Sequence, residues 1–307
     1  MCTALAALGI VSHFLPIHHH VTLVLAVASP FLTVLAPLAV VIFLVGRRWI
    51  GCALAMALSV IAVALQLPVF ISGDTGGRTV PVRVMTANLY LGLADAESLV
   101  KSAETGADVL ALQELTHDEV DRIQAAGISR SFPYQSLDAR DGAEGVGIWS
   151  RFPLLQSRRI EGYQLAMVTT RVQVENVATD PTILVAHLPG PWPQPIDDWD
   201  RDLERLPTTL ADVSQRSENG CVIVAGDFNS TLDMKPFRQV LAGGFRDAVE
   251  QAGAGYLPTY PANSHVPPFM AIDHVLTARC SASSAGTVPL PGSDHRGLAT
   301  TIDVPVR

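Results

Sequence analysis

The sequence predicts a four-layer α/β sandwich, in which two mixed and largely antiparallel sheets lie between outer helices, preceded by transmembrane helices at the N-terminus. Three observations carry this prediction. From residue 82 onward, apolar runs of strand length alternate with helical patterns. Between residues 134 and 187, short β-rich runs follow one another without room for crossover helices, so these strands should pair antiparallel. Finally, no Asp or Glu occurs before Asp74.

The first quarter of the chain has the composition of a membrane region. Residues 21–45 and 49–72 are uncharged stretches of 25 and 24 residues, and about 20 residues suffice for a helix to cross the hydrocarbon core of a bilayer. Pro30 and Pro37 are tolerated in such a helix, because neighbouring helices satisfy the carbonyl groups that a proline frees. The apolar residues 2–17 are either a short third span or a segment on the membrane surface.

The expected organisation is a membrane region of two or three transmembrane helices (residues 1–72), a linker with Gly and Pro (73–81) and one folded domain (82–307). Arg47 and Arg48 lie in the only short loop with charge, and such loops tend to stay in the cytoplasm. We therefore expect a multi-pass protein of the plasma membrane with an extracytoplasmic domain. Everything after the membrane region carries all 29 acidic and 19 of the 21 basic residues, a net charge of −10.

The elements of the domain follow from periodicity and from the residues that end them. Gly106 closes the first helical pattern, and Leu203, Leu206, Leu210 and Val213 form the apolar stripe of a later helix. Two antiparallel-rich sheets bury such continuous apolar strands on both faces, which a doubly wound parallel sheet suits less well. The expected strands are residues 82–91, 107–115, 134–137, 145–150, 154–162, 166–175, 182–188, 221–229, 271–280 and 297–304; the expected helices are 94–106, 117–127, 199–217, 234–243 and 245–253.

The cysteines and a histidine run indicate no zinc site. No CxxC spacing occurs, so Cys221 and Cys280 are expected to be buried thiols, or a disulfide if the domain is exported. Residues 18–20 are three adjacent histidines between apolar stretches, which favours a polar turn at the membrane interface over a metal cluster.

Polar side chains stand at the ends of several apolar strands. In residues 221–229, Asp227 and Asn229 are two positions apart and should share one face of the strand. A local Asx turn explains this pair alone. Four other apolar runs end in the same manner, and a later loop adds an acid and a histidine, which together equip a site for acid–base chemistry around a hard cation. These further residues are Asn88, Glu114, His187, Asp273, Asp294 and His295.

The ordered segments ANLYLG, LALQEL, GVGIWSRFPL, AHLPGP, VAGDFNST, IDHVLT and GSDHRGL resemble the signatures of the endonuclease/exonuclease/phosphatase superfamily over residues 82–305. The resemblance implies the four-layer sandwich, hydrolysis of phosphate esters and Mg²⁺ or Mn²⁺ as cofactor. It further implies that Glu114 is the main metal ligand, with Asn88 beside it and Asp294 closing the site.

The same resemblance assigns the remaining roles. His295 is the general base, oriented by Asp273, and Asp227 positions the attacking water. Asn229 and His187 contact phosphoryl oxygens, where they stabilise the charge that grows in the transition state. Glu144 pairs with His187, as in deoxyribonuclease-like members of the superfamily.

The substrate stays open at this level. A nuclease-like phosphodiesterase is the first expectation, although a net charge of −10 offers little attraction for a polyanion. A head-group phosphodiesterase acting on phospholipid or sphingomyelin, or an inositol-phosphate phosphatase, is the alternative. An alternative of another functional class is a catalytically silent binding module. The complete set of site residues argues against it. No obligate protein partner is evident.

Overall fold

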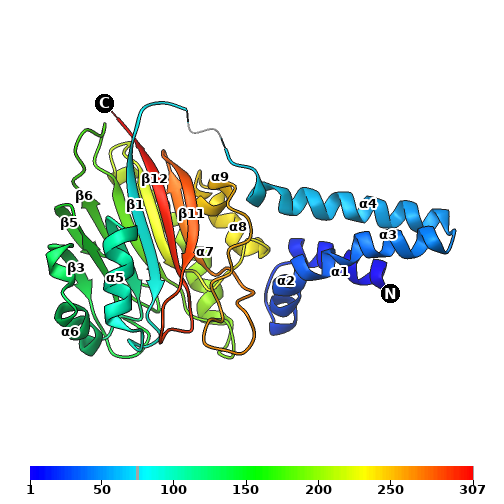
Figure 1. The fold of residues 1–307 in the computed structure, drawn as a ribbon, viewed down its shortest axis with the longest axis horizontal. Coiled ribbons are helices and arrows are strands. Elements are labelled where there is room, and N and C mark those ends of the chain that lie inside the picture. Colours follow the sequence, from blue (N-terminus) through cyan, green and yellow to red (C-terminus); the bar gives the residue numbers. More distant parts are fainter. Residues whose placement is uncertain (74–75, 307) are drawn as a thin grey trace.

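Two six-stranded sheets pack face to face in the domain, and helices cover their outer faces (Figure 1). The fold is that of a computed structural model, which describes residues 1–73 and 76–306. The predicted α/β sandwich of two mixed sheets is confirmed.

The first sheet has the strand order β11-β12-β1-β2-β4-β3, and only its central pair, β1 and β2, is parallel. Most of its inward side chains are Val, Ile or Ala, which fit a pleated surface that is buried on both faces. The strands are β1 (Thr79–Asn88), β2 (Val109–Gln113), β3 (Tyr134–Asp138), β4 (Val146–Ser150), β11 (Ser281–Val288) and β12 (Gly297–Pro305).

The second sheet repeats this plan with the order β5-β6-β7-β8-β10-β9, in which β7 and β8 are the parallel pair. Strand β8 is buried throughout, and it lies between β7 and the antiparallel β10. The strands are β5 (Leu154–Arg159), β6 (Val168–Val172), β7 (Thr182–His187), β8 (Val222–Asp227), β9 (Arg246–Asp247) and β10 (Asp273–Ala278).

The outer helices bury one apolar face each. Asp95 and Thr116 cap the first two of them by accepting hydrogen bonds from the backbone N–H groups of Ser98 and Glu119. The predicted stripe on residues 199–217 is buried against the second sheet. The first sheet is covered by α5 (Ala96–Gly106), α6 (His117–Ala125) and a short 3-10 helix, η2 (Ile128–Arg130). The second sheet is covered by α7 (Asp197–Arg216) and α8 (Lys235–Leu241). The short α9 (Ala248–Ala252) lies near the N-terminal helices.

Two strand predictions need correction. The interpretation of Asp273 as the end of an apolar run is wrong, because Asp273 begins β10, near the start of the strand expected over residues 271–280. Since β10 runs antiparallel to β8, its first residue still lies at the edge where β8 ends. Strand β11 was not predicted, because residues 281–288 are mainly Ser, Ala, Gly and Thr and lack an apolar alternation. It is an edge strand held by β12.

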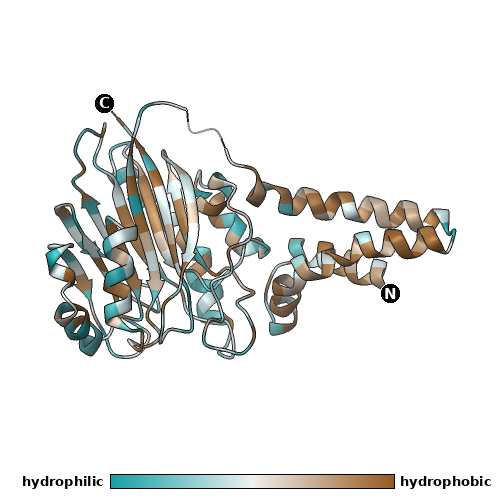
Figure 2. Cartoon of the chain, viewed as in Figure 1, coloured by the Kyte–Doolittle hydropathy of each residue, from teal (hydrophilic) through white to brown (hydrophobic). Residues whose placement is uncertain are grey.

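The N-terminal region forms four helices that project from one end of the domain (Figure 1) and are apolar along most of their length (Figure 2). Within the described residues, Trp49–Phe70 is the helix long and apolar enough to cross a membrane, and α2 and α3 together make a second candidate. The helices are α1 (Cys2–Phe14), α2 (His20–Thr33), α3 (Leu35–Val45) and α4 (Trp49–Gln66), the last continued by η1 (Leu67–Phe70).

Residues 21–45 are not one continuous helix, because α2 and α3 meet at an angle of 46°. Pro37 explains the position of this break. Its ring nitrogen has no hydrogen to donate to the carbonyl group of Thr33, four residues earlier, and Thr33 is where α2 ends.

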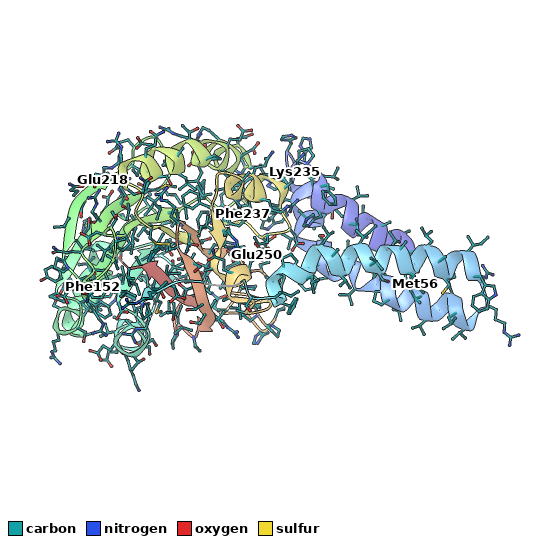
Figure 3. All side chains as sticks on the ribbon, turned by 90° about the horizontal axis from the view of Figure 1, so that it is seen from above. Met56, Phe152, Glu218, Lys235, Phe237 and Glu250 are labelled. Carbon is teal, nitrogen blue, oxygen red and sulfur yellow. A yellow bond between two sulfur atoms is a disulfide. The ribbon has the colours of Figure 1, made fainter. Side chains whose placement is uncertain are left out.

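The helices pack on the domain through apolar side chains, among them Ile17, Leu23 and Val69, and through a small polar contact. Asp233 accepts a hydrogen bond of 2.9 Å from Gln66 at the end of α4 and lies 3.3 Å from Nδ1 of His13 in α1. Arg238 of α8 donates to the carbonyl oxygen of His13. Figure 3 shows Lys235 and Glu250 at this end of the domain, with Phe152 and Glu218 near the opposite end.

Candidate active site

Strand direction explains why the predicted site residues meet. The parallel pairs β1–β2 and β7–β8 end at one edge of the sandwich, and β10 begins there. The register places Asp227 directly between His187 on β7 and Asp273 on β10. Eight of the nine predicted residues lie at this edge: Asn88, Glu114, His187, Asp227, Asn229, Asp273, Asp294 and His295.

Asn88 joins the two sheets at the site. Its Nδ2 donates hydrogen bonds of 3.0 Å to Glu114 Oε1, just after β2, and to Asp227 Oδ2 at the end of β8. The backbone N–H of Leu91 donates to the other oxygen of Glu114 at 2.6 Å. The carboxylates of the two sheets are therefore held at a defined separation by an amide that contacts both.

Asp227 and Asn229 form the Asx turn that their spacing predicts, because the N–H of Asn229 donates to Asp227 Oδ1 at 2.8 Å. The side-chain amide of Asn229 also donates to the carbonyl oxygen of Leu188 at 2.9 Å. The turn is thus structural and still leaves Asp227 Oδ2 directed into the site. A Cβ on Gly226 would collide with the carbonyl of Ala186, so only glycine lets β8 approach β7 this closely.

His295 is oriented by Asp273, whose Oδ2 lies 2.8 Å from its Nδ1. Its Nε2 then faces the centre of the site, 3.7 Å from Asp227 Oδ2 and 4.0 Å from Asp294 Oδ1. His295 is 4% exposed, so bulk water does not compete with these contacts.

His187 faces the same centre from β7. Its Nε2 lies 4.0 Å from Glu114 Oε1 and 3.9 Å from Asp227 Oδ2, which is longer than a hydrogen bond. Among the described residues, its buried Nδ1 has no hydrogen-bond partner. The imidazole is therefore poised beside the two carboxylates without being tied to either.

The charges at this edge are costly to bury. Burial, and next the nearby charge of Asp273, raise the pKa of Asp227 to about 7. Burial also raises the pKa of Asp294 and lowers that of His187. For His295, burial opposes the charged form, but the carboxylates of Asp273 and Asp227 outweigh it and raise the pKa to about 10. A cation bound at this edge would offset the crowding of negative charge.

Glu144 is the exception among the predicted residues. Its side chain is mostly exposed and lies 3.8 Å from Arg140, and no contact with His187 is found in the described part of the chain. The expected pairing of Glu144 with His187 is corrected accordingly. Glu144 is the last residue of the turn over residues 141–144, just before β4, and its carboxylate points toward Arg140 and solvent.

Sequence reasoning missed three residues that shape the site. Ser293 is buried; its Oγ donates to the carbonyl of Asn88 at 2.7 Å and accepts from the N–H of His295 at 2.9 Å. Thr259 accepts a weak hydrogen bond from the N–H of Asp273, and the ring of Tyr260 lies 4.9 Å from the ring of His295. The serine of the GSDH segment was a visible signal, whereas nothing local marks Thr259 or Tyr260.

Four residues near the catalytic edge adopt left-handed backbone conformations that are uncommon outside glycine. The φ angles are 55° at Glu114 and 48° at Asn229, and those of Tyr90 and Leu91 are 49° and 55°. Such conformations persist only where the surrounding structure determines them, and they concentrate at functional sites.

The comparisons with known proteins give a family for the chain. A family model described as "Endonuclease/Exonuclease/phosphatase family" matches residues 85–295. No curated protein matches the chain.

Solved structures show the fold. An endonuclease/exonuclease/phosphatase family protein from Bacteroides thetaiotaomicron is 12% identical, with 74% of this chain and 98% of that chain covered and a TM-score of 0.59. TDP2 from D. rerio, complexed with single-strand DNA product, is 21% identical, with coverages of 72% and 98% and a TM-score of 0.59. The 3' phosphatase NExo from Neisseria, bound to product DNA hairpin, is 16% identical, with coverages of 71% and 98% and a TM-score of 0.58.

Removal of the Ser293 hydroxyl should loosen the site. In Ser293→Ala, a buried carbonyl of Asn88 and a buried N–H of His295 lose their partner, which we expect to destabilise the chain by about 1–3 kcal/mol. The thermal unfolding midpoint of the full chain measures this. The matched control is Ser264→Ala, an exposed serine whose hydroxyl makes only a local bond to Val266; equal midpoints for both variants would refute the role of Ser293.

Proposed function

Because the chain belongs to the endonuclease/exonuclease/phosphatase family, whose members are phosphoric ester hydrolases, we propose that it is a membrane-anchored phosphodiesterase assisted by a divalent metal ion. The observation that carries the proposal is the arrangement of His295: Asp273 holds its Nδ1, and its Nε2 faces Asp227 at 3.7 Å. A binding module has no need for an imidazole fixed in one orientation among buried carboxylates.

The donor set fits a divalent cation. Burial and neighbouring carboxylates raise the pKa of Asp227 and Asp294, and no Lys or Arg contacts either side chain among the described residues. One set of three groups, Asp227, Asp273 and His295, has ligand atoms within 4.8 Å of one another. Asp273 and His295 are already bonded to each other, however, so that set is the weaker candidate.

We therefore assign the metal to Glu114, Asn88 and Asp294, with oxygen donors of the kind that Mg²⁺ and Mn²⁺ prefer. When bound, the cation screens the phosphate charge and polarises a phosphoryl oxygen.

The protein side chains account for the rest of the hydrolysis. Asp227 Oδ2 accepts a hydrogen bond from a water molecule and aims it at phosphorus. His295 Nε2 takes a proton from that water, for which the imidazole must be neutral; a cation at this edge would oppose the charged form of His295, which the carboxylates otherwise favour. The water oxygen forms a bond to phosphorus as the ester P–O bond breaks, and the departing alkoxide takes a proton from solvent water, while His295 later returns its own proton to solvent. His187 and the side-chain amide of Asn229 donate to phosphoryl oxygens, where negative charge increases in the transition state.

A membrane anchor and an oxidising compartment complete the proposal. The apolar helices α2 to α4 supply the spans, and the Arg47–Arg48 loop favours a cytoplasmic hairpin end with the domain outside. Cys221 and Cys280 form a disulfide between the start of β8 and the end of β10, as expected of an exported domain. We propose, accordingly, that the protein crosses the plasma membrane with two or three transmembrane helices.

Nucleic acid is one substrate class to consider, since the D. rerio and Neisseria structures contain DNA. The net charge of −10 after the membrane region gives no general attraction for a polyanion, however. We therefore propose phosphodiester hydrolysis as the reaction and argue the substrate separately below.

Metal removal should abolish turnover. Purified full-length chain should hydrolyse the test diester bis(4-nitrophenyl) phosphate with Mg²⁺ or Mn²⁺, lose the activity in EDTA and regain it when either ion is restored. Release of 4-nitrophenolate measures the rate. Undiminished turnover after exhaustive chelation would contradict the metal assignment.

Substitutions of the proposed base and water-positioning groups should slow the chemical step. We expect His295→Ala and Asp227→Asn each to lower kcat by about 10² or more, because each removes a proton-transfer or positioning group. Glu175→Gln, an exposed carboxylate in the loop before β7, is the matched control and should retain the parent kcat. A wild-type rate in either site variant would refute its role.

The disulfide gives a test of topology. In full-length chain isolated from membranes under acid quench, a thiol-reactive polymer should label two cysteines, Cys2 and Cys52, before reduction and four after it. Cys280→Ser is the control and should show three labelled cysteines under both conditions. Four labelled cysteines in the unreduced parent chain would place the domain in a reducing compartment.

A further inference from the structure

An apolar groove adjoins the catalytic edge on the side that faces α2. It has a volume of about 340 Å³. One wall is helix α2, with Val24 and Val27, and the opposite wall is the segment before β10, with Phe269 and Met270. Trp192 forms the rim, is 62% exposed and packs edge-on against His20. The groove thus lies between the N-terminal helices and the domain.

The groove borders the catalytic edge, because two of its lining residues also lie at that edge. Asn229, the proposed phosphoryl contact, lines its inner end. Tyr260 lines the groove as well, and its ring lies 4.9 Å from the ring of His295. If the phosphate of a substrate lies between Asn229 and His295, one of its two ester groups can therefore extend into the groove.

The walls have the chemistry of a site for hydrocarbon. No charged side chain lines the groove among the described residues, and its only polar groups are those of Asn229, Tyr260 and Trp192. Leu23, Val24 and Val27 of α2 line the groove together with Met234 and Ile272 of the domain. Small-molecule sites are typically concave and lined mostly by apolar side chains with a few polar groups, as this groove is. A polyanion would find no cation here to neutralise its phosphates.

We infer that this groove holds the apolar chain of a membrane-derived phosphodiester, so that the substrate is an amphiphile drawn from the bilayer around α2. The inference rests on the proposed hydrolase function and names its substrate class. Helix α2 belongs to the apolar N-terminal region, so a lipid beside it reaches the groove without passing its chain through water. Asn229 and Tyr260 then mark the boundary between the apolar chain and the phosphate.

The test is a chain-length series of alkyl 4-nitrophenyl phosphate diesters, from methyl through butyl to octyl, each used as a monomer. The enzyme is the full-length chain in a steroid-based detergent, which has no alkyl tail to compete. We expect kcat/KM to rise by up to about fourfold for each methylene that the groove buries and to level off once it is full. A flat series with measurable methyl-ester turnover would overturn the groove and leave the proposed function standing.

A pair of variants on one helix locates the effect. Val24→Trp places a large ring in the groove and should lower the ratio of kcat/KM for the octyl diester to that for the methyl diester at least tenfold. Val21→Trp is the matched control, on the same helix but outside the groove, and should behave as the parent. If the preference for the octyl diester persists in Val24→Trp, or if both variants lose it equally, the alkyl chain of the substrate binds elsewhere and the inference is wrong.

A second measurement does not depend on turnover. A decyl phosphonate carrying a terminal diazirine should crosslink on irradiation to the peptides that hold Val24 to Val27 or Phe269 to Met270, and excess octyl phosphonate should suppress this. If these crosslinks form but no diester is hydrolysed, the proposed hydrolase function is refuted, while the groove remains a binding site for an alkyl chain. Crosslinks spread along α3 and α4 alone would refute the groove. Suppression by a single-stranded oligonucleotide, in place of the alkyl phosphonate, would identify a nucleic-acid site instead.

Discussion

The hydrogen bonds that Asn88 donates to Glu114 and Asp227 are the contact on which the site depends. They join the edge of one sheet to the edge of the other, and they set the distance between carboxylates that would otherwise repel. Buried charges are costly unless they are hydrogen-bonded or neutralised. The hydrogen-bond donors at this edge stabilise its carboxylates in part, and a bound cation would stabilise them further. Burial and the charge of Asp273 raise the pKa of Asp227, as expected of a carboxylate in such surroundings.

Strand alternation lets one dipeptide serve two purposes. Asp273 and His274 are neighbours at the start of β10, so their side chains point to opposite faces of the sheet. Asp273 turns to His295 in the catalytic cluster. His274 turns away from the cluster and is buried between Asp247, at 2.7 Å, and the carbonyl oxygen of Ser230, at 2.8 Å. The second pair anchors the segment after β8, and therefore supports Asp227 from behind.

The N-terminal helices contribute to the site as well as to anchoring. Asp233 contacts Gln66 and lies beside His13, which seats α1 and α4 on the domain a few residues after the catalytic strand β8. Helix α2 supplies a wall of the groove that meets Asn229. The proposal of a membrane-derived substrate follows from this placement, because the same helices that would hold the enzyme in a bilayer border the entrance to its catalytic edge.

The sequence by itself determined the sandwich class, most strands and helices, and eight residues of the candidate site, because strand period, capping residues and ordered motifs are local signals. The tertiary structure alone decided how those residues meet: Glu144, in the turn over residues 141–144, pairs with Arg140 and not with His187, and Tyr260 enters the site from a loop without a distinctive pattern. It also paired Cys221 with Cys280 and set α2 beside the groove. Contacts between segments far apart in the chain depend on packing, which no local pattern encodes.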